Sequence, residues 1–325
     1  MSNSYVLGID TSNYTTSVAV ANGDGQIVAN LKRPLPVGEG ACGLRQSDAL
    51  FAHTKNLPLL MQELRSVLGD ERPVAVGVSS RPRNVEGSYM PCFLAGVAAA
   101  ESAAAVLGAP LYTFSHQCGH LRAAMYAAGR EELLQAPFGA FHISGGTTEM
   151  LLAEPDGVGF RATLLGGTAD LNAGQAVDRI GVMLGLSFPC GPALEKLAEE
   201  YLRENGSTSV PKRKVKVENG LIHLSGLENM AKRLYEETED KGLCAAFTLL
   251  YIASALSAMS AWLREKQGAR LPILYAGGVM SNRIIAEKIK KEFSNVFFAT
   301  PAFSADNAAG IALLALAAHR AEKQP

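Results

Sequence analysis

Cysteine is scarce in this sequence, and its distribution argues against two classes of protein. The 325 residues contain five cysteines with no CxxC pair, at Cys42, Cys92, Cys118, Cys190 and Cys244. Zinc ribbons and thioredoxin-type redox sites need paired thiols, and disulfide scaffolds need an even, regularly spaced set. We therefore expect a reducing compartment, the cytoplasm. The opening residues MSNS, which carry no basic segment ahead of the first apolar stretch, agree with this expectation.

Net charge and long apolar runs are lacking as well. Thirty basic residues stand against thirty-one acidic ones, so no global field draws the protein onto nucleic acid or an anionic membrane. An RNA partner would need a local basic patch or a helper subunit. The two most apolar stretches, 93–107 and 311–318, are shorter than the roughly 20 residues of a membrane span. We expect both to be buried helices and expect no membrane partner.

The chain contains a short internal repeat. A length of 325 residues exceeds what one hydrophobic core usually fills, which favours two lobes. TTSVAVANGDG (15–25) aligns without a gap with TTEMLLAEPDG (147–157), and apolar strand-like segments flank both copies. Because Asp-Gly is a hairpin signal, the repeat predicts a β-meander at the start of each lobe. The first turns, 10–16 and 144–148, would expose amides and hydroxyls that suit a phosphate. Two unrelated hairpins are the alternative.

Strand-like and helix-like segments alternate after each copy. VAVGVSS (74–80) precedes a predicted helix near 91–107, and LPILYAGGV (271–279) precedes another near 282–293. This alternation predicts an α/β fold with parallel strand pairing and helices on the sheet faces. The more polar, helical region 185–241 is typical of an insertion.

The segment SHQCGH (115–120) holds two of the six histidines. His116 and His120 are four residues apart, so on a helix they share a face and can reach one metal ion. The alternative is two histidines bonded to backbone carbonyls. Gln117 stands where a zinc protease has its glutamate base, and an amide cannot take a proton, so protease activity is disfavoured.

Other candidates each have a structural and a functional interpretation. Glycine pairs at strand ends, 145–146 and 277–278, allow a tight turn or a close approach to a ligand. Asp178 is a solvated carboxylate or a ribose-hydroxyl acceptor. Asp306 either favours the dipole of the last helix, with Ser304 as N-cap, or is the third metal ligand. The basic run 212–216 is a solvated loop or an RNA-contacting patch.

Taken in order, these segments resemble the tRNA threonylcarbamoyltransferase family TsaD, also known as the Gcp or O-sialoglycoprotein endopeptidase family. The resemblance runs along essentially the whole chain. The stretches that carry it are GIDTS (8–12), HQCGH (116–120), SGG (144–146), GQAVDRIGVMLGLSFPCGP (174–192), SGL (225–227), AGGVMSNRII (276–285) and ADNAAGIA (305–312).

This resemblance implies an actin-like ATPase fold, shared with sugar kinases and chaperone ATPases, of two duplicated ribonuclease H-like lobes with an interlobe cleft. Lobe I would be 1–109 with a C-terminal helix, 303–323, returning to it. Lobe II would be 110–302 with the insertion at about 185–241.

The implied activity is transfer of a threonylcarbamoyl group from threonylcarbamoyl-AMP to N6 of adenosine 37 in tRNA. The resemblance assigns zinc or iron to His116, His120 and Asp306, and an adenine nucleotide or the acyl-adenylate to Asp178, Gly191, Gly277, Gly278 and Asn282. It places Asp10, Ser144, Gly145, Gly146 and Thr147 around the transferred group. TsaB-like and TsaE-like proteins, or a second copy, would be partners.

Several positions depart from the family pattern. Asn13, Tyr14, Thr15 and Thr16 replace Cys-Asp-Glu-Thr, Thr147 replaces a histidine, Cys118 replaces a glutamate, and the glycine-rich loop reads RPRNVEGS (81–88). These changes are typical of a divergent paralogue. Two alternatives therefore stay open. One is another nucleotide-dependent carbamoyl or phosphoryl transferase whose Arg81 and Arg83 grip an anionic substrate. The other is a non-catalytic partner subunit of a TsaD-type complex.

Overall fold

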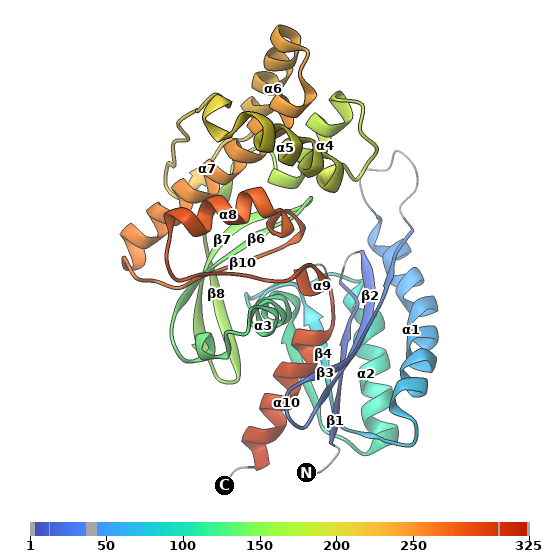
Figure 1. Cartoon of the computed structure of the whole chain (residues 1–325). Helices are drawn as coiled ribbons and strands as arrows, with labels where there is room; N and C mark the ends of the chain where they lie inside the picture. Colours follow the sequence, from blue (N-terminus) through green and yellow to red (C-terminus); the bar gives the residue numbers. More distant parts are fainter. Residues whose placement is uncertain (1–3, 13, 37–43, 305, 324–325) are drawn as a thin grey trace. The chain divides into compact units, whose positions relative to one another are not determined.

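The structure is a computed structural model that describes residues 4–12, 14–36, 44–304 and 306–323. Cys42 and Asn13 lie outside the described residues. The chain forms two compact units (Figure 1). The first contains residues 1–135, 154–162 and 305–325, and the second contains residues 136–153 and 163–304. Residues 110–135, which the sequence analysis assigned to lobe II, are in the first unit. The lobe boundaries themselves stay a prediction.

The first unit is built on a five-stranded sheet of order β3-β2-β1-β4-β5. Its strands are β1 (Tyr5–Asp10), β2 (Thr15–Asn22), β3 (Ile27–Pro34), β4 (Pro73–Arg81) and β5 (Leu111–Ser115). β1, β2 and β3 form the predicted antiparallel meander. β1, β4 and β5 pair in parallel, as the βα alternation predicted.

Helices cover both faces of this sheet. They are α1 (Gln46–Leu68), α2 (Phe93–Leu107), α3 (His116–Ala128), the short η1 (Glu131–Gln135) and α10 (Ala309–Lys323). Leu7 and Ile9 of β1 pack in one cluster with residues of α1 and α2. Gly8 lies between them and faces α10, where a Cβ would meet Ala312 N at 2.5 Å. Because side chains alternate along a strand, one face takes large residues and the other admits α10 at close range.

The second unit is built on a six-stranded sheet of order β11-β10-β6-β7-β8-β9. Its strands are β6 (Phe138–Ile143), β7 (Thr148–Asp156), β8 (Gly159–Thr168), β9 (Leu221–Ile222), β10 (Ile273–Ala276) and β11 (Val296–Phe298). β6, β7 and β8 form the second predicted meander, and the end of its β7–β8 hairpin belongs to the first unit. β10 pairs in parallel with β6 and β11.

The helices of the second unit surround its main core. They are α4 (Ala173–Met183), α5 (Gly191–Asn205), η2 (Ser207–Ser209), α6 (Ser225–Thr238), α7 (Lys241–Gln267), η3 (Gly278–Ser281), α8 (Arg283–Glu292) and α9 (Pro301–Ser304). The predicted insertion supplies α5, β9 and α6, and α5 and α6 both pack on α7. Within the described ranges, only α7 is long and apolar enough to cross a membrane. It is mostly buried, as a core helix is.

The C-terminal helix begins later than predicted. The predicted helix spans 303–323, with Ser304 as N-cap. The structure instead has the four-residue α9, a bend that contains Asp306, and then α10. The Ser304 hydroxyl donates to Thr300 O at 2.9 Å, whereas Ala309 N donates to Asn307 Oδ1 at 3.0 Å. Ser304 as N-cap is therefore wrong, and Asn307 makes the side-chain contact at the start of α10.

Candidate functional site

His116 and His120 lie on the first turns of α3. Ser115 caps this helix, because its hydroxyl oxygen accepts from Cys118 N at 3.2 Å. The two imidazole rings are on one helical face, with centroids 4.3 Å apart and an interplanar angle of 81°. The predicted i,i+4 arrangement is therefore present, and both rings point to one place.

Asp306 completes a three-residue cluster in the first unit. Its Oδ1 is 3.0 Å from His120 Nε2 and 3.7 Å from His116 Nε2. The three potential ligand atoms all lie within 4.8 Å of one another. Two imidazole nitrogens and one carboxylate form a donor set that zinc accepts and that leaves a coordination position open. The residues therefore fit the metal ion that the sequence analysis expected.

Asp10 holds His116 from the other side of its ring. Asp10 Oδ2 is 2.8 Å from His116 Nδ1, and the carboxylate is 1% exposed. Ser12 donates to Asp10 through its amide and its hydroxyl, each at 3.2 Å, and the Ser79 hydroxyl makes a further short hydrogen bond. A carboxylate behind a ligating histidine fixes the ring and its tautomer. Asp10 was predicted to lie near the transferred group, and its contact with His116 was not predicted.

Parallel pairing explains why these side chains meet. β1 ends at Asp10, Ser79 lies near the end of β4, and β5 ends directly before His116. Because the carboxyl ends of parallel strands lie at one edge of a sheet, residues distant in sequence converge there. The position of Asp10 at the end of a predicted strand was the signal that could have linked it to His116.

Asp10 and His116 form an ion pair when no metal is bound. Burial acts to lower the pKa of His116, but the Asp10 and Asp306 carboxylates outweigh it and raise that pKa to about 9. Burial acts to raise the pKa of Asp10, but the charge and hydrogen bond of His116 and the Ser79 hydroxyl lower it below its usual value. Metal binding at this cluster must therefore displace a proton from His116.

Glycines allow α10 to lie close to α3 and so set the position of Asp306. A Cβ on Gly310 would meet Gly119 O at 1.8 Å. A Cβ on Gly119 would meet the Ile311 side chain at 2.8 Å. Only glycine permits this approach of the two backbones. At this crossing α3 carries His116 and His120, and Asp306 lies just before the start of α10.

A pocket of ≈ 250 Å³ lies in the second unit. Five of the predicted nucleotide-binding and catalytic positions line it, together with neighbouring residues of α4, α5 and η3. These positions are Gly145, Asp178, Gly191, Gly278 and Asn282. Ser144, Gly146 and Gly277 adjoin these residues in sequence, and Thr147 follows two residues after Gly145, but none of the four is part of the lining.

Two polar residues of this lining, Asp178 and Asn282, are held by hydrogen bonds. Asp178 Oδ1 accepts from Cys190 N at 2.8 Å at the start of α5. Asn282 caps α8, because its Oδ1 accepts from Ile285 N at 3.0 Å. The carboxylate and the amide are thus positioned before any ligand arrives, and both groups suit ribose hydroxyls or a base edge.

The glycines here serve two purposes. Gly277 has φ +99°, and a Cβ there would meet Ile143 O at 2.2 Å. Backbone packing therefore requires glycine at this position. At Gly145, Gly191 and Gly278 a Cβ would meet nothing within 4 Å. The missing side chains at these three positions leave space in the pocket rather than relieve a clash.

The turn after β6 lies beside this pocket. Ser144 N donates to Thr147 O at 2.8 Å, and Gly146 N donates to the Ser144 hydroxyl at 3.3 Å. Asn172 Nδ2 donates to Gly146 O at 3.0 Å and ties the turn to the start of α4. A closed turn with an exposed glycine pair can bring its backbone close to a ligand.

Comparison with known proteins decides the family. The family model of tRNA N6-adenosine threonylcarbamoyltransferase, TsaD, matches residues 49–313. This chain belongs to the TsaD family. A relative of that name from Thermus thermophilus is 34% identical, with 97% of this chain and 93% of the relative covered. One from Streptococcus pneumoniae is 28% identical, with 96% and 91% covered. TsaD proteins are transferases, so the expectation of an enzyme is confirmed.

Solved structures confirm the fold. The (R)-2-hydroxyglutaryl-CoA dehydratase component A from Acidaminococcus fermentans superimposes with a TM-score of 0.54, covering 98% of this chain and all of the other, at 14% identity. This similarity shows the fold alone. The fold is that of the actin-like ATPases, as the sequence resemblance implied.

The departures from the TsaD pattern have structural counterparts in the first unit. Cys118 is outside the cluster of His116, His120 and Asp306, and its thiol donates to Phe160 O at 3.1 Å. Burial raises the pKa of this thiol. Arg81 donates to Asn84 Oδ1 at 2.9 Å, and Asn84 donates to Phe160 O at 3.2 Å. The loop that replaces the glycine-rich loop is therefore anchored on the same carbonyl as Cys118. Tyr14 is 40% exposed.

Proposed function

We propose that this protein transfers the threonylcarbamoyl group of threonylcarbamoyl-AMP to N6 of adenosine 37 in tRNA, with a zinc or iron ion held by His116, His120 and Asp306. The observation that carries the proposal is the convergence of these three ligand groups, backed by the buried Asp10. A bound ion would polarise the transferred carbonyl as a Lewis acid.

The chain's own residues would perform the remaining tasks. Asp10 keeps His116 oriented with Nε2 facing Asp306, which is the orientation a ligand needs. Asp178 and Asn282 would orient the adenosine part of the substrate. The turn at 144–147 would bring backbone amides to the acyl-phosphate, which carries negative charge. TsaB-like and TsaE-like proteins, or a second copy of the chain, are the proposed partners, and the cytoplasm is the proposed compartment.

The metal site is tested by elemental analysis after mild purification. Wild type should contain about one equivalent of zinc or iron, while His116→Ala and Asp306→Ala should lose most of it. His223→Ala is the matched control, because His223 is an exposed histidine of the second unit, paired with Asp170 at 3.3 Å. A wild type that stays metal-free after reloading, or ligand variants with full metal content, would refute the site.

The transfer itself is tested with threonylcarbamoyl-AMP, tRNA and the partner proteins. The tRNA is then digested and the modified adenosine is quantified by mass spectrometry. Wild type should produce it, and the two metal-ligand variants should not rise above the no-enzyme control. A metal-loaded wild type that gives no modified adenosine would refute tRNA as the acceptor.

One observation favours a second candidate function. Arg81 donates to the Ser80 hydroxyl and to Asn84 Oδ1, which are both neutral, so its charge meets no acidic partner within the described ranges. An uncompensated guanidinium suits a carboxylate or phosphate ligand. The second candidate is therefore another nucleotide-dependent carbamoyl or phosphoryl transfer to an anionic substrate. In this case Arg81→Gln would abolish carbamoyl or phosphoryl transfer to the anionic substrate. The presence of the complete metal cluster argues against a non-catalytic subunit.

A further inference from the structure

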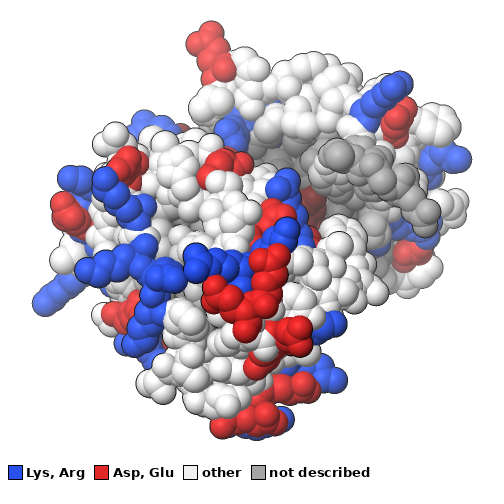
Figure 2. All heavy atoms as spheres, turned by 90° about the horizontal axis from the view of Figure 1, so that it is seen from above, with Lys and Arg blue, Asp and Glu red and all other residues white. Residues whose placement is uncertain are grey.

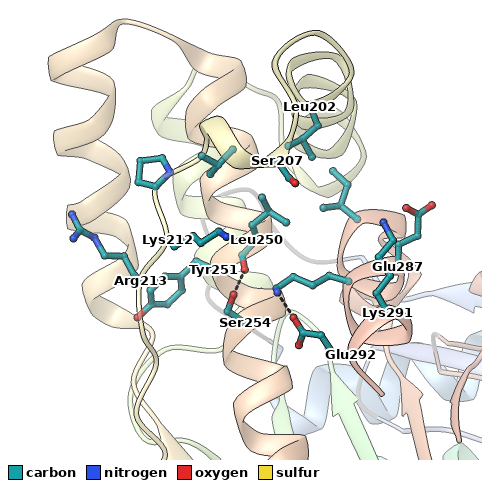
Figure 3. A pocket seen from close by; sticks show the side chains of 14 residues that line it. Leu202, Ser207, Lys212, Arg213, Leu250, Tyr251, Ser254, Glu287, Lys291 and Glu292 are labelled. Atoms are coloured by element: carbon teal, nitrogen blue, oxygen red, sulfur yellow. Dashed lines mark hydrogen bonds and ion pairs between the residues drawn. The ribbon is translucent and has the colours of Figure 1, made fainter. Parts of the chain in front are cut away.

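The second unit contains a larger pocket that the proposed function does not use. It has a volume of ≈ 640 Å³ and lies among the end of α5, the segment 207–213, α7 and α8 (Figure 3). Its lining comprises Leu202, Ser207, Val210, Pro211, Lys212, Arg213, Leu250, Tyr251, Ser254, Ile284, Glu287, Lys288, Lys291 and Glu292. None of these residues belongs to the metal cluster or to the smaller pocket described above.

Positive charge predominates in this lining. Four cations, Lys212, Arg213, Lys288 and Lys291, face two carboxylates, Glu287 and Glu292. Lys288 makes a short ion pair with Glu292. Lys212, Arg213 and Lys291 have no ion pair within the described part of the chain. The lining thus has a net charge of +2, although the whole chain carries −1.

The basic run that the sequence analysis noted therefore has a location. Lys212 and Arg213 belong to an exposed loop between η2 and β9, and Lys291 comes from α8, about 80 residues later in the sequence. In Figure 3, Lys212 extends toward Leu250 of α7, while Lys291 lies across the pocket on α8. On the face seen in Figure 2, Lys and Arg side chains gather at the left, with some Asp and Glu side chains among them. Tertiary packing has brought separate cations to one concave surface.

Most of the remaining lining is apolar, and it includes one aromatic ring. Leu202, Val210, Leu250 and Ile284 contribute aliphatic surface, and Tyr251 contributes a ring. The Ser254 hydroxyl donates to Leu250 O at 2.8 Å. A pocket for an inorganic anion alone would need no such surface, and a pocket for an apolar ligand would not need three uncompensated cations. The two features together suit a ligand that joins phosphate to a flat, partly apolar ring.

We propose that this pocket binds a phosphorylated nucleoside, with phosphate on Lys212, Arg213 and Lys291 and the base against Tyr251 and its aliphatic neighbours. The nucleoside comes either from a single-stranded stretch of RNA or from a free nucleotide, because both present the same chemistry. The proposal goes beyond the proposed function, which is assigned to other residues. Its test measures binding only, so it can fail or succeed independently of metal content and of acyl transfer.

Two probes separate the two sources. The first is cytidine 3′,5′-bisphosphate, a free nucleotide with phosphates on both sides, measured by calorimetry. The second is a fluorescein-labelled single-stranded oligocytidine, measured by anisotropy at several salt concentrations. Cytidine is chosen because the smaller pocket is proposed to take adenosine. Binding of both probes identifies a site for any nucleotide, and binding of the oligomer alone identifies an RNA site.

Two pocket variants and one control decide whether this pocket is the site. The first is the triple variant Lys212→Ser, Arg213→Ser and Lys291→Ser. We expect it to bind at least about 10-fold more weakly and to lower the salt slope for the oligomer by about 2, since each single-strand phosphate contact contributes roughly 0.7. The second is Ser254→Phe, which fills the pocket without changing its charge and should also weaken binding.

The control variant makes the same change in net charge elsewhere in the second unit. It is Lys196→Ser, Lys232→Ser and Lys266→Ser, all in exposed positions on α5, α6 and α7. It should bind within about twofold of wild type if the pocket is the site. An equal loss in the control, full binding by both pocket variants, or wild-type binding of both probes no tighter than about 1 mM would overturn the proposal. Circular dichroism and metal content are compared for all variants, and exposed substitutions of this kind usually change stability by less than about 0.5 kcal/mol.

Discussion

Gly310→Ala is the substitution that best tests how the first unit positions the cluster of His116, His120 and Asp306. Gly310 lies on the first turn of α10, where this helix crosses α3. The Cβ of an alanine would lie 1.8 Å from Gly119 O and 2.8 Å from Ala123 N. Both atoms belong to helix backbone, so no flexible side chain can move aside. The two helices must separate.

The size of the effect follows from this distance. Real Cβ contacts are essentially never below 3.0 Å, so the two atoms must move apart by about 1.2 Å in a close-packed interior. Overpacking of this kind costs about 1–3 kcal/mol or more. For a unit of this size, each kcal/mol lowers Tm by about 2–4 °C, so we expect a decrease of about 2–12 °C. The 3.0 Å distance from Asp306 Oδ1 to His120 Nε2 should lengthen as well, and metal content should fall.

The assay is differential scanning calorimetry with elemental analysis of the same samples. Gly226→Ala is the control, because Gly226 is also helical but a Cβ there meets nothing within 4 Å. Alanine is favoured over glycine in helices by up to about 1 kcal/mol, so the control should keep or raise Tm. If Gly310→Ala melted within about 1 °C of wild type and kept its metal, the close crossing would not be what positions Asp306.

Three further outcomes are expected. Asp10→Asn should lower metal affinity about 10–100-fold while the fold stays intact, as measured by competition with a chelator and by circular dichroism. Asn282→Ala should weaken binding of AMP by about 10-fold, as measured by calorimetry. Asn282→Ser keeps a helix cap and so separates loss of the amide from loss of the cap. Unchanged AMP binding in both variants would exclude this residue from the site. Asp170→Asn should destabilise the second unit by about 1–2 kcal/mol, because Asp170 accepts hydrogen bonds from the amides of Leu224 and Ser225 and from the Ser225 hydroxyl. Burial acts to raise the folded-state pKa of Asp170, but these bonds hold it well below its usual range. The stability that Asp170 contributes is therefore complete above about pH 4 and is lost as pH falls further. In urea titrations at several pH values, the variant should lose less stability on acidification than wild type, and parallel curves would contradict this role.

Local patterns in the sequence determined the secondary structure and the fold class. The two Thr-rich, Asp-Gly-terminated segments predicted the two meanders, and the βα alternation predicted the parallel strands, because strand and helix periodicities are properties of a few neighbouring residues. The same local reasoning put His116 and His120 on one helical face. It failed at Ser304, since a possible N-cap residue can equally donate to the carbonyl of an earlier turn.

Only the tertiary structure decided which distant residues meet. The contact of His116 with Asp10 joins residues 106 apart in sequence, and that of His120 with Asp306 joins residues 186 apart. The first contact arises at the carboxyl edge of the sheet, where β1 and β5 both end. The second arises from glycines that let α10 approach α3. Lys212 and Lys291 likewise meet at one pocket only because their loop and α8 both lie beside α7. Such contacts depend on the packing of whole elements, which no short window of sequence contains.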